Sequence, residues 1–156
     1  MKENSPQRGT ILSASTFIQA PQEKVWQVVQ EIGDIQSFHP LIKKSYRLNE
    51  KHGLGAERHC ELKPMGVMDE QIISWKEGEG FTAKVIGGKM LPPCEYMLGD
   101  LSLKAEGRGT RVSFTFRYAM KFGLLGKIMN HLLIKPQFKA APLKYVEGLK
   151  VYVEKN

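Results

Sequence analysis

The sequence predicts an α+β fold in which a strongly curved antiparallel sheet of about seven strands wraps around one long C-terminal helix. Three observations predict it. A strand pattern at residues 10–20 is followed by short helical segments, residues 41–120 alternate in strand fashion between Gly and Pro breaks, and the pattern turns helical from Gly123. With 156 residues, the chain is long enough to bury a core as one domain. We expect that domain at residues 10–156, after a flexible tail at residues 1–9.

The first strand is expected to end at Pro21, which suits the first turn of a helix because its missing N–H needs no partner there. The helix that follows is indicated by four apolar residues at helical spacing, ended by Gly33; they are Val25, Val28, Val29 and Ile32. A short turn, DIQSF, then leads to the second strand. We therefore expect two short helices between strands one and two.

Six further strands are expected, at residues 41–50, 55–62, 67–76, 80–88, 95–105 and 109–120. The last alternates most regularly, with one apolar row formed by Val112, Phe114, Phe116, Tyr118 and Met120. Such alternation is typical of an antiparallel sheet that is buried on one face and solvated on the other. One helix cannot fill the concave face of so large a sheet, so the pattern predicts a cavity between sheet and helix.

The C-terminal helix is expected to be interrupted. Its first apolar stripe comprises Ile128, Met129, Leu132 and Leu133, and its second stripe comprises Leu143, Val146, Leu149, Lys150 and Val153. Pro136 and Pro142 lie between the stripes, and proline inside a helix removes a hydrogen bond and clashes with the preceding turn. The break is therefore predicted within residues 135–142.

Several classes of protein are disfavoured by what the sequence lacks. No apolar run approaches the roughly 18 residues that cross a bilayer, and the polar start MKENSPQRGT does not resemble a signal peptide. With Cys60 and Cys94 interpreted as reduced thiols, we expect a cytoplasmic protein. The His and Cys residues have no metal-ligand spacing and no phosphate-binding or dinucleotide motif is present, so neither a metal nor another cofactor is expected.

The net charge of +7 is concentrated in the last third, where residues 101–156 carry 11 Lys or Arg and 3 Asp or Glu. One interpretation is a lysine-rich solvated face. The alternative is docking to an acidic partner or transient contact with an anionic membrane. Nucleic acid is not an expected partner, because the basic residues form no arginine cluster and have no interleaved aromatic residues.

Four segments together resemble a known family: IQAPQEKVWQVVQEIGDIQSFHP, GLGAERHCEL, GVMDEQIISW and GRGTRVSFTFRYAMKFGLLG. Over residues 10–154 the chain is similar to the polyketide cyclase/dehydrase branch of the START-like, or SRPBCC, superfamily, which has the helix-grip fold of the birch pollen allergen. The resemblance implies a binder of a hydrophobic or amphipathic small molecule, for transport or sequestration. A cofactor-independent cyclase or dehydratase acting on a polyketide-like or aromatic substrate is the alternative. Monomer and dimer are both open.

Alternation places Arg58 with apolar neighbours on one strand and Glu70 likewise on the next. A hairpin around the KPMG turn brings the two residues opposite each other. Because an unpaired buried charge costs several kcal/mol, we predict an internal Arg58–Glu70 ion pair. Two interpretations stay open. The pair fixes the strand register, or Arg58 offers its guanidinium to a ligand carboxylate or enolate while Glu70 orients it.

His39 precedes Pro40, which favours an extended backbone at the histidine and turns the chain from helix to strand. It is interpreted either as a corner residue or as an imidazole that lines the cavity and moves protons. His39, Arg58 and Glu70 are the weak catalytic candidates. A nucleophilic Cys60 needs a base, and nothing in the sequence places one beside it.

The predicted cavity lining combines these residues with the apolar faces of the strands and the last helix: His39, Arg58, Cys60, Met68, Glu70, Tyr96, Phe114, Phe116, Tyr118, Met129 and Leu133. The segment GGKMLPP at residues 87–93 joins a Gly pair to apolar residues. It is interpreted as a gate over the cavity mouth or as a plain loop, and methionines suit an adaptable lining.

Overall fold

The computed structural model describes residues 9–156, so the tail predicted at residues 1–9 lies outside the described residues apart from Gly9. Seven antiparallel strands form one sheet in the order β1-β7-β6-β5-β4-β3-β2. The strands are β1 (Thr10–Ile18), β2 (Ile42–Arg47), β3 (Glu57–Leu62), β4 (Val67–Lys76), β5 (Gly80–Lys89), β6 (Cys94–Glu106) and β7 (Gly109–Met120). The predicted strands are confirmed, and most boundaries agree within two residues.

The second strand is shorter than predicted because the chain leaves the sheet after Arg47. Asn49 stabilises the departure: its side-chain oxygen accepts hydrogen bonds from the backbone N–H groups of Lys51 and Glu57, each 3.2 Å long. Side-chain oxygens of Asn commonly replace ladder hydrogen bonds in this way. The loop therefore starts three residues before the predicted end of the strand.

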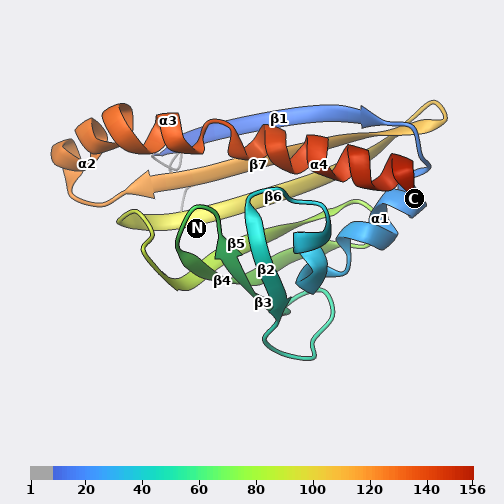
Figure 1. Ribbon diagram of the computed structural model, residues 1–156, viewed down its shortest axis with the longest axis horizontal. Coiled ribbons are helices and arrows are strands. Elements are labelled where there is room, and N and C mark those ends of the chain that lie inside the picture. The colour runs from blue at the N-terminus through green and yellow to red at the C-terminus, as the bar shows by residue number, and fades with distance from the viewer. Residues whose placement is uncertain (1–8) are drawn as a thin grey trace, which may run out of the picture.

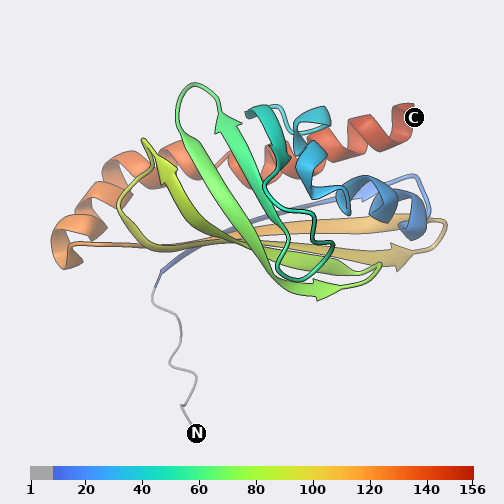
Figure 2. The ribbon, with the colours of Figure 1, turned by 90° about the horizontal axis from the view of Figure 1, so that it is seen from below.

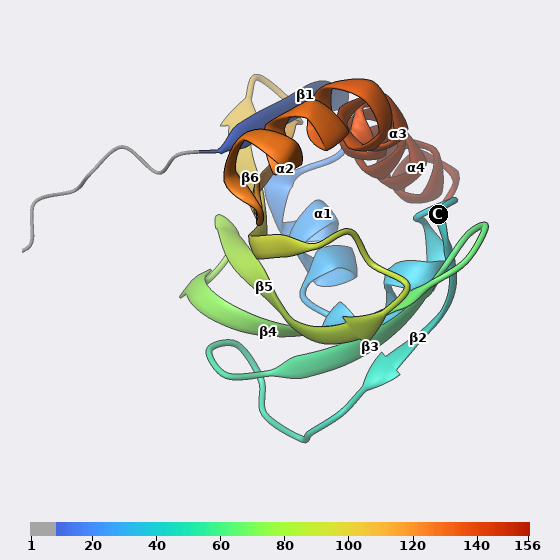
Figure 3. The ribbon, with the colours of Figure 1, turned by 90° about the vertical axis from the view of Figure 1, so that its left-hand side faces the viewer.

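The sheet curls around the helices, as the end-on view of Figure 3 shows. The long helix α4 (Ala141–Lys155) lies along β1 and β7 and contacts α1 (Gln22–Val29). In Figure 2, α1 and the 3₁₀ helix η1 (Ile32–Ser37) lie at the same end as the C-terminus. The predicted helix-grip fold and its two short helices are confirmed.

The C-terminal helix is interrupted in the segment that the positions of Pro136 and Pro142 predicted. Helix α2 (Gly123–Met129), the π-helical turn η2 (Asn130–Ile134) and α3 (Lys135–Phe138) precede the break at residues 139–140, and α4 follows it. Pro136 and Pro142 each lie within the first turn of their helix, where the missing N–H is tolerated. The prediction of a break within residues 135–142 is confirmed.

Side chains from the sheet and helices form two apolar clusters. The larger lies between the sheet, α1, η1 and α4. The smaller lies beneath α2, η2 and α3, and its buried members are Met97, Tyr118 and Ile134. Met97 and Met120 face Met129 across this cluster, so the smaller core is rich in methionine.

The first predicted stripe of the C-terminal helix differs from the structure. Met129 packs against the smaller cluster, but Ile128, Leu132 and Leu133 are exposed. For Leu132 and Leu133 the physical reason is the π-helical turn, in which each hydrogen bond spans one residue more than in an α-helix. That turn rotates Ile134 inward in place of Leu133.

Candidate functional site

The predicted ion pair between Arg58 and Glu70 is present in the interior. The two residues are direct partners across β3 and β4, and Nε of Arg58 donates to Oε2 of Glu70 at 2.7 Å. Both residues are buried, with 4% and 7% of their surface exposed. Nη1 of Arg58 donates to the carbonyl oxygen of Ile32 at 3.1 Å, which ties the sheet to η1.

Electrostatics keep this pair charged. Burial disfavours the guanidinium cation, but the adjacent Glu70 carboxylate outweighs that cost and raises the pKa of Arg58 above its usual value. Among the described residues, no partner hydrogen-bonds to Nη2 of Arg58 or to Oε1 of Glu70. Within residues 9–156, no fully buried side-chain nitrogen or oxygen lacks a hydrogen-bond partner. Because Nη2 of Arg58 and Oε1 of Glu70 have no partner, these two atoms are not fully buried, and a polar group can reach them.

Tyr145 covers the pair from α4. Its ring stacks on Phe114 of β7 with the centroids 4.2 Å apart and the planes inclined by 10°. Burial raises the pKa of its hydroxyl, the charge of Arg58 lowers that pKa, and the charge of Glu70 raises it. Sequence reasoning missed Tyr145, although its spacing of four residues from Leu149 puts it on the inward face of α4. That spacing is the signal that could have found it.

His39 closes the corner between η1 and β2. Its Nδ1 accepts a hydrogen bond from the backbone N–H of Leu41 at 3.2 Å, and its ring meets that of Tyr145 edge-on at 5.5 Å. Burial, together with the positive charges of Arg58 and Lys144, lowers the pKa of His39 to about 4. The ring is therefore neutral at pH 7, with its proton on Nε2 and its lone pair already engaged.

Cys60 completes the group of residues around the pair. It lies opposite Met68 across β3 and β4 and is fully buried. Burial raises the pKa of its thiol to about 12, so it is not a thiolate at neutral pH. His39, Arg58, Cys60, Glu70 and Tyr145 are hereafter called the Arg58 cluster.

The other predicted lining residues divide between three places. Phe114 forms the apolar wall beside Tyr145. Phe116, Tyr118 and Met129 belong to the smaller core, where the Tyr118 hydroxyl donates to Oδ1 of Asn130 at 2.6 Å. Leu133 and Tyr96 do not face the interior.

Leu133 is 64% exposed on the outer side of its helix. Tyr96 pairs with Ala119, and so lies on the convex face of the sheet with Leu98 and Asp100. Regular alternation with the inward-facing Met97, Leu101 and Leu103 puts Tyr96 on that outer face, because the register shift between Cys94 and Tyr96 lies before it. That alternation is the sequence signal that could have excluded Tyr96 from the lining.

Two hollows lie on the outside of the molecule. One, of about 530 Å³, is lined by Arg47, Leu48, Asn49, Glu50 and His52. The other, of about 480 Å³, lies between the His39 corner and α4, and its lining includes Phe38, Pro40, Gly148 and Tyr152. Neither of these two hollows is lined by Arg58.

No three His, Cys, Asp or Glu side chains within residues 9–156 are grouped to hold a metal ion. In the same part of the chain, no helix is both long and apolar enough to cross a bilayer.

The seven-stranded curved sheet and the long C-terminal helix form the helix-grip fold. Residues 10–154 match the family described as polyketide cyclase/dehydrase and lipid transport. The chain therefore belongs to this family. No curated protein matches the sequence.

Solved structures share the fold at low sequence identity. The Zhui aromatase/cyclase from Streptomyces sp. R1128 is similar with a TM-score of 0.80 and 11% identity, over 95% of each chain. TTHA0849 from Thermus thermophilus gives a TM-score of 0.73 and 17% identity, over 92% of this chain and 97% of that one. Ara h 8.0201 is similar with a TM-score of 0.71 and 13% identity, over 95% of this chain and 99% of that one.

Proposed function

We propose that the protein binds a hydrophobic or amphipathic small molecule between its sheet and C-terminal helix, and that Arg58 is the polar anchor. The observation that carries the proposal is the buried guanidinium, which keeps free donors at Nη2 while Glu70 holds it in place. A fixed, desolvated guanidinium suits a carboxylate or enolate oxygen, because charge-assisted hydrogen bonds are strong in a low-dielectric interior. Lipid transport in the family description supports a binding role.

The apolar part of the ligand extends toward the smaller core beneath α2, η2 and α3. Met97, Met120 and Met129 meet there, and unbranched thioether side chains rearrange at low cost. Such side chains can adjust to the shape of the apolar part of the ligand.

A cyclase or dehydratase is the competing function, since the family description names both. The Arg58 cluster favours binding over turnover. Neutral His39 has its lone pair engaged, and Cys60 remains a thiol, so Glu70 is the one carboxylate left as a base in the cluster. Glu70 is itself engaged, because its Oε2 accepts the hydrogen bond from Nε of Arg58 at 2.7 Å.

Native mass spectrometry of the purified protein tests the proposal. We expect an adduct of a small amphipathic molecule that survives gentle ionisation and that solvent extraction identifies. The double variant Arg58→Met/Glu70→Met should lose the adduct while keeping the fold, because replacing both partners of a buried pair by apolar residues is often neutral.

The matched control is Arg117→Met/Asp100→Met, which removes an ion pair of the same 2.7 Å length from the convex face. It should retain the adduct. An adduct that persists in the interior variant, or a wild-type protein that neither carries a ligand nor takes up a fluorescent fatty acid, contradicts the proposal.

A further inference from the structure

One end of the molecule exposes an unusual amount of apolar surface. Six large apolar side chains between positions 122 and 133, along α2 and η2, are exposed: Phe122, Leu124, Leu125, Ile128, Leu132 and Leu133. The opposite side of the same segment packs on the smaller core through Met129 and Ile134. A helix that is apolar on both sides is normally covered on both sides.

Two loops extend this surface. The backbone N–H of Lys121 donates to the carbonyl oxygen of Pro93 at 2.8 Å, which places the β5–β6 loop beside the start of α2. Met90 at the tip of that loop is 70% exposed, and Met65 in the adjacent β3–β4 turn is also exposed. We call these exposed side chains, together with those of α2 and η2, the apolar end.

Backbone strain marks the same place. Met90 and Phe122 have φ values of 59° and 70°, a left-handed conformation that bulky residues rarely adopt. They are the two residues other than glycine with positive φ in residues 9–156, and both hold an apolar side chain out toward solvent. Strain of this kind persists at sites where function requires it.

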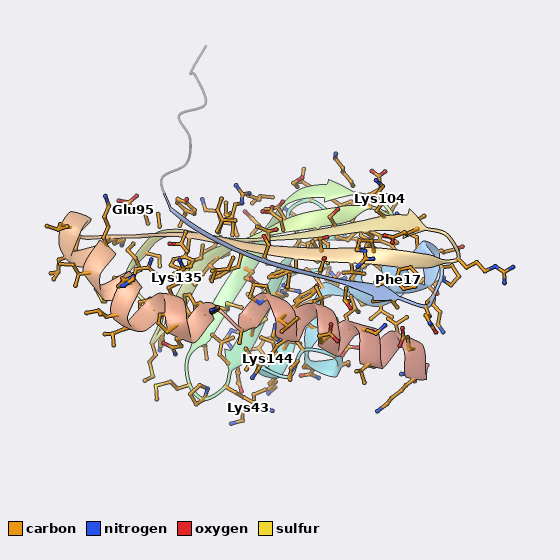
Figure 4. The ribbon with its side chains drawn as sticks, turned by 90° about the horizontal axis from the view of Figure 1, so that it is seen from above. Phe17, Lys43, Glu95, Lys104, Lys135 and Lys144 are labelled. Atoms are coloured by element: carbon orange, nitrogen blue, oxygen red, sulfur yellow. The ribbon has the colours of Figure 1, made fainter. Side chains whose placement is uncertain are left out.

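The charges around the apolar end have one predominant sign. Lys89, Lys121, Lys127, Lys135 and Lys139 are all exposed on or beside it. The sequence has no Asp or Glu between Glu106 and Glu147, so the helical part of the end carries lysines alone. Figure 4 shows Lys135 and Glu95 at this end, with Lys104 at the opposite one.

We propose that the apolar end docks on the surface of an anionic phospholipid bilayer. Exposed Leu, Ile, Phe and Met side chains insert at the level of the headgroups, and the lysines extend to the phosphates around them. This combination of exposed apolar side chains at one end with flanking lysines matches an anionic interface, whereas an acidic protein surface would leave the leucines without apolar partners. The proposal goes beyond ligand binding and does not depend on it.

Flotation with vesicles tests the docking, comparing phosphatidylcholine alone with a mixture of phosphatidylcholine and phosphatidylglycerol. The wild type should bind the mixture and be released by high salt, because lysine attraction is screened. Leu124→Gln/Leu132→Gln should bind at least about tenfold more weakly. The affinity of Lys127→Gln/Lys135→Gln for the mixed vesicles should fall about fivefold per lysine at low salt.

Two matched controls separate docking from general loss of apolar or charged surface. Leu54→Gln removes a leucine that is 65% exposed elsewhere, and Lys104→Gln removes a lysine from the opposite end. Both should bind like the wild type. Glu95→Gln should bind more tightly than the wild type, since it removes the nearby negative charge.

Hydrogen exchange gives a second measurement, and mixed vesicles should protect the amides of residues 122–134. Three results would overturn the proposal. The wild type does not bind mixed vesicles, or the Leu54 and Leu124/Leu132 variants lose vesicle binding equally. In the third, the wild type does not bind vesicles but is a dimer, and the Leu124/Leu132 variant is a monomer. The last would assign the apolar end to a second copy of the chain.

Discussion

Gly148 of α4 lies directly against the carbonyl oxygen of Phe38, so closely that a β-carbon at position 148 would overlap that oxygen. The same β-carbon would also lie 3.0 Å from Cδ of Pro40. The His39–Pro40 corner and the long helix therefore meet backbone to backbone, and this contact closes one side of the Arg58 cluster. Gly148 holds the corner shut because it has no side chain.

Gly148→Ala should destabilise the protein by about 1–3 kcal/mol, because the added methyl group meets backbone, which cannot rotate away. Urea unfolding followed by circular dichroism measures the loss. Gly87→Ala is the control, since a β-carbon there meets nothing within 4 Å. An unchanged midpoint for Gly148→Ala would show that α4 and the corner are not in firm contact.

The Arg58–Glu70 pair should respond very differently to single and double substitution. Arg58→Met leaves a buried carboxylate without its cation and should cost about 3–5 kcal/mol of unfolding free energy, and Glu70→Met should cost a similar amount. The double variant should recover most of that loss. A double-mutant cycle in urea measures the coupling, and additive losses would mean that the two side chains do not pair in solution.

The parts of the structure that sequence reasoning predicted depend on local rules. Alternation and a short turn fixed which residues of β3 and β4 oppose each other, so the Arg58–Glu70 pair followed from spacing alone. Proline chemistry placed the break before α4. The failures have two different causes. Tyr96 alternates with the inward-facing Met97, so strand spacing excludes it from the interior. The π-helical turn at Asn130–Ile134, in which Leu133 lies exposed, has no sequence signature.

The Arg58 cluster was predicted only in part for a similar reason. Its strand members follow from alternation, but Tyr145 comes from a helix more than seventy positions away, and its contact with Phe114 depends on how α4 crosses the sheet. The sequence also left open whether His39 is a corner residue or lines the interior. Its hydrogen bond to Leu41 suits a corner residue, while its contact with Tyr145 also makes it a wall of the cluster.

Stability should fall in acid because of His39. Its pKa is about 4 in the folded protein against 6.5 when exposed, so between these values the unfolded chain binds a proton that the folded chain does not. The stabilisation is complete above pH 6.5 and is lost as the pH falls toward 4, a change of about 3 kcal/mol. The free energy of unfolding, measured in urea at several pH values, should show this slope.

His39→Asn should flatten the slope, because an Asn oxygen can accept the Leu41 N–H and does not titrate in this range. His52→Asn, in an exposed loop, is the control and should leave the slope as in the wild type. If both variants retain the wild-type pH dependence, His39 is not buried as a neutral ring.

Asn130 should be the residue that fixes η2 to the sheet. Its Oδ1 accepts from the Tyr118 hydroxyl at 2.6 Å and its Nδ2 donates to the Thr10 hydroxyl at 2.9 Å, so one amide joins the helix to β7 and β1. Asn130→Ala removes both of these hydrogen bonds, leaves the buried Tyr118 hydroxyl with Thr10 as its remaining partner, and should cost about 1–3 kcal/mol. Tyr118→Phe in the same background should restore part of the loss, since it removes the hydroxyl that lost its acceptor. Hydrogen exchange should show faster opening of residues 123–138 in Asn130→Ala, and unchanged exchange there would mean that apolar packing alone holds the segment.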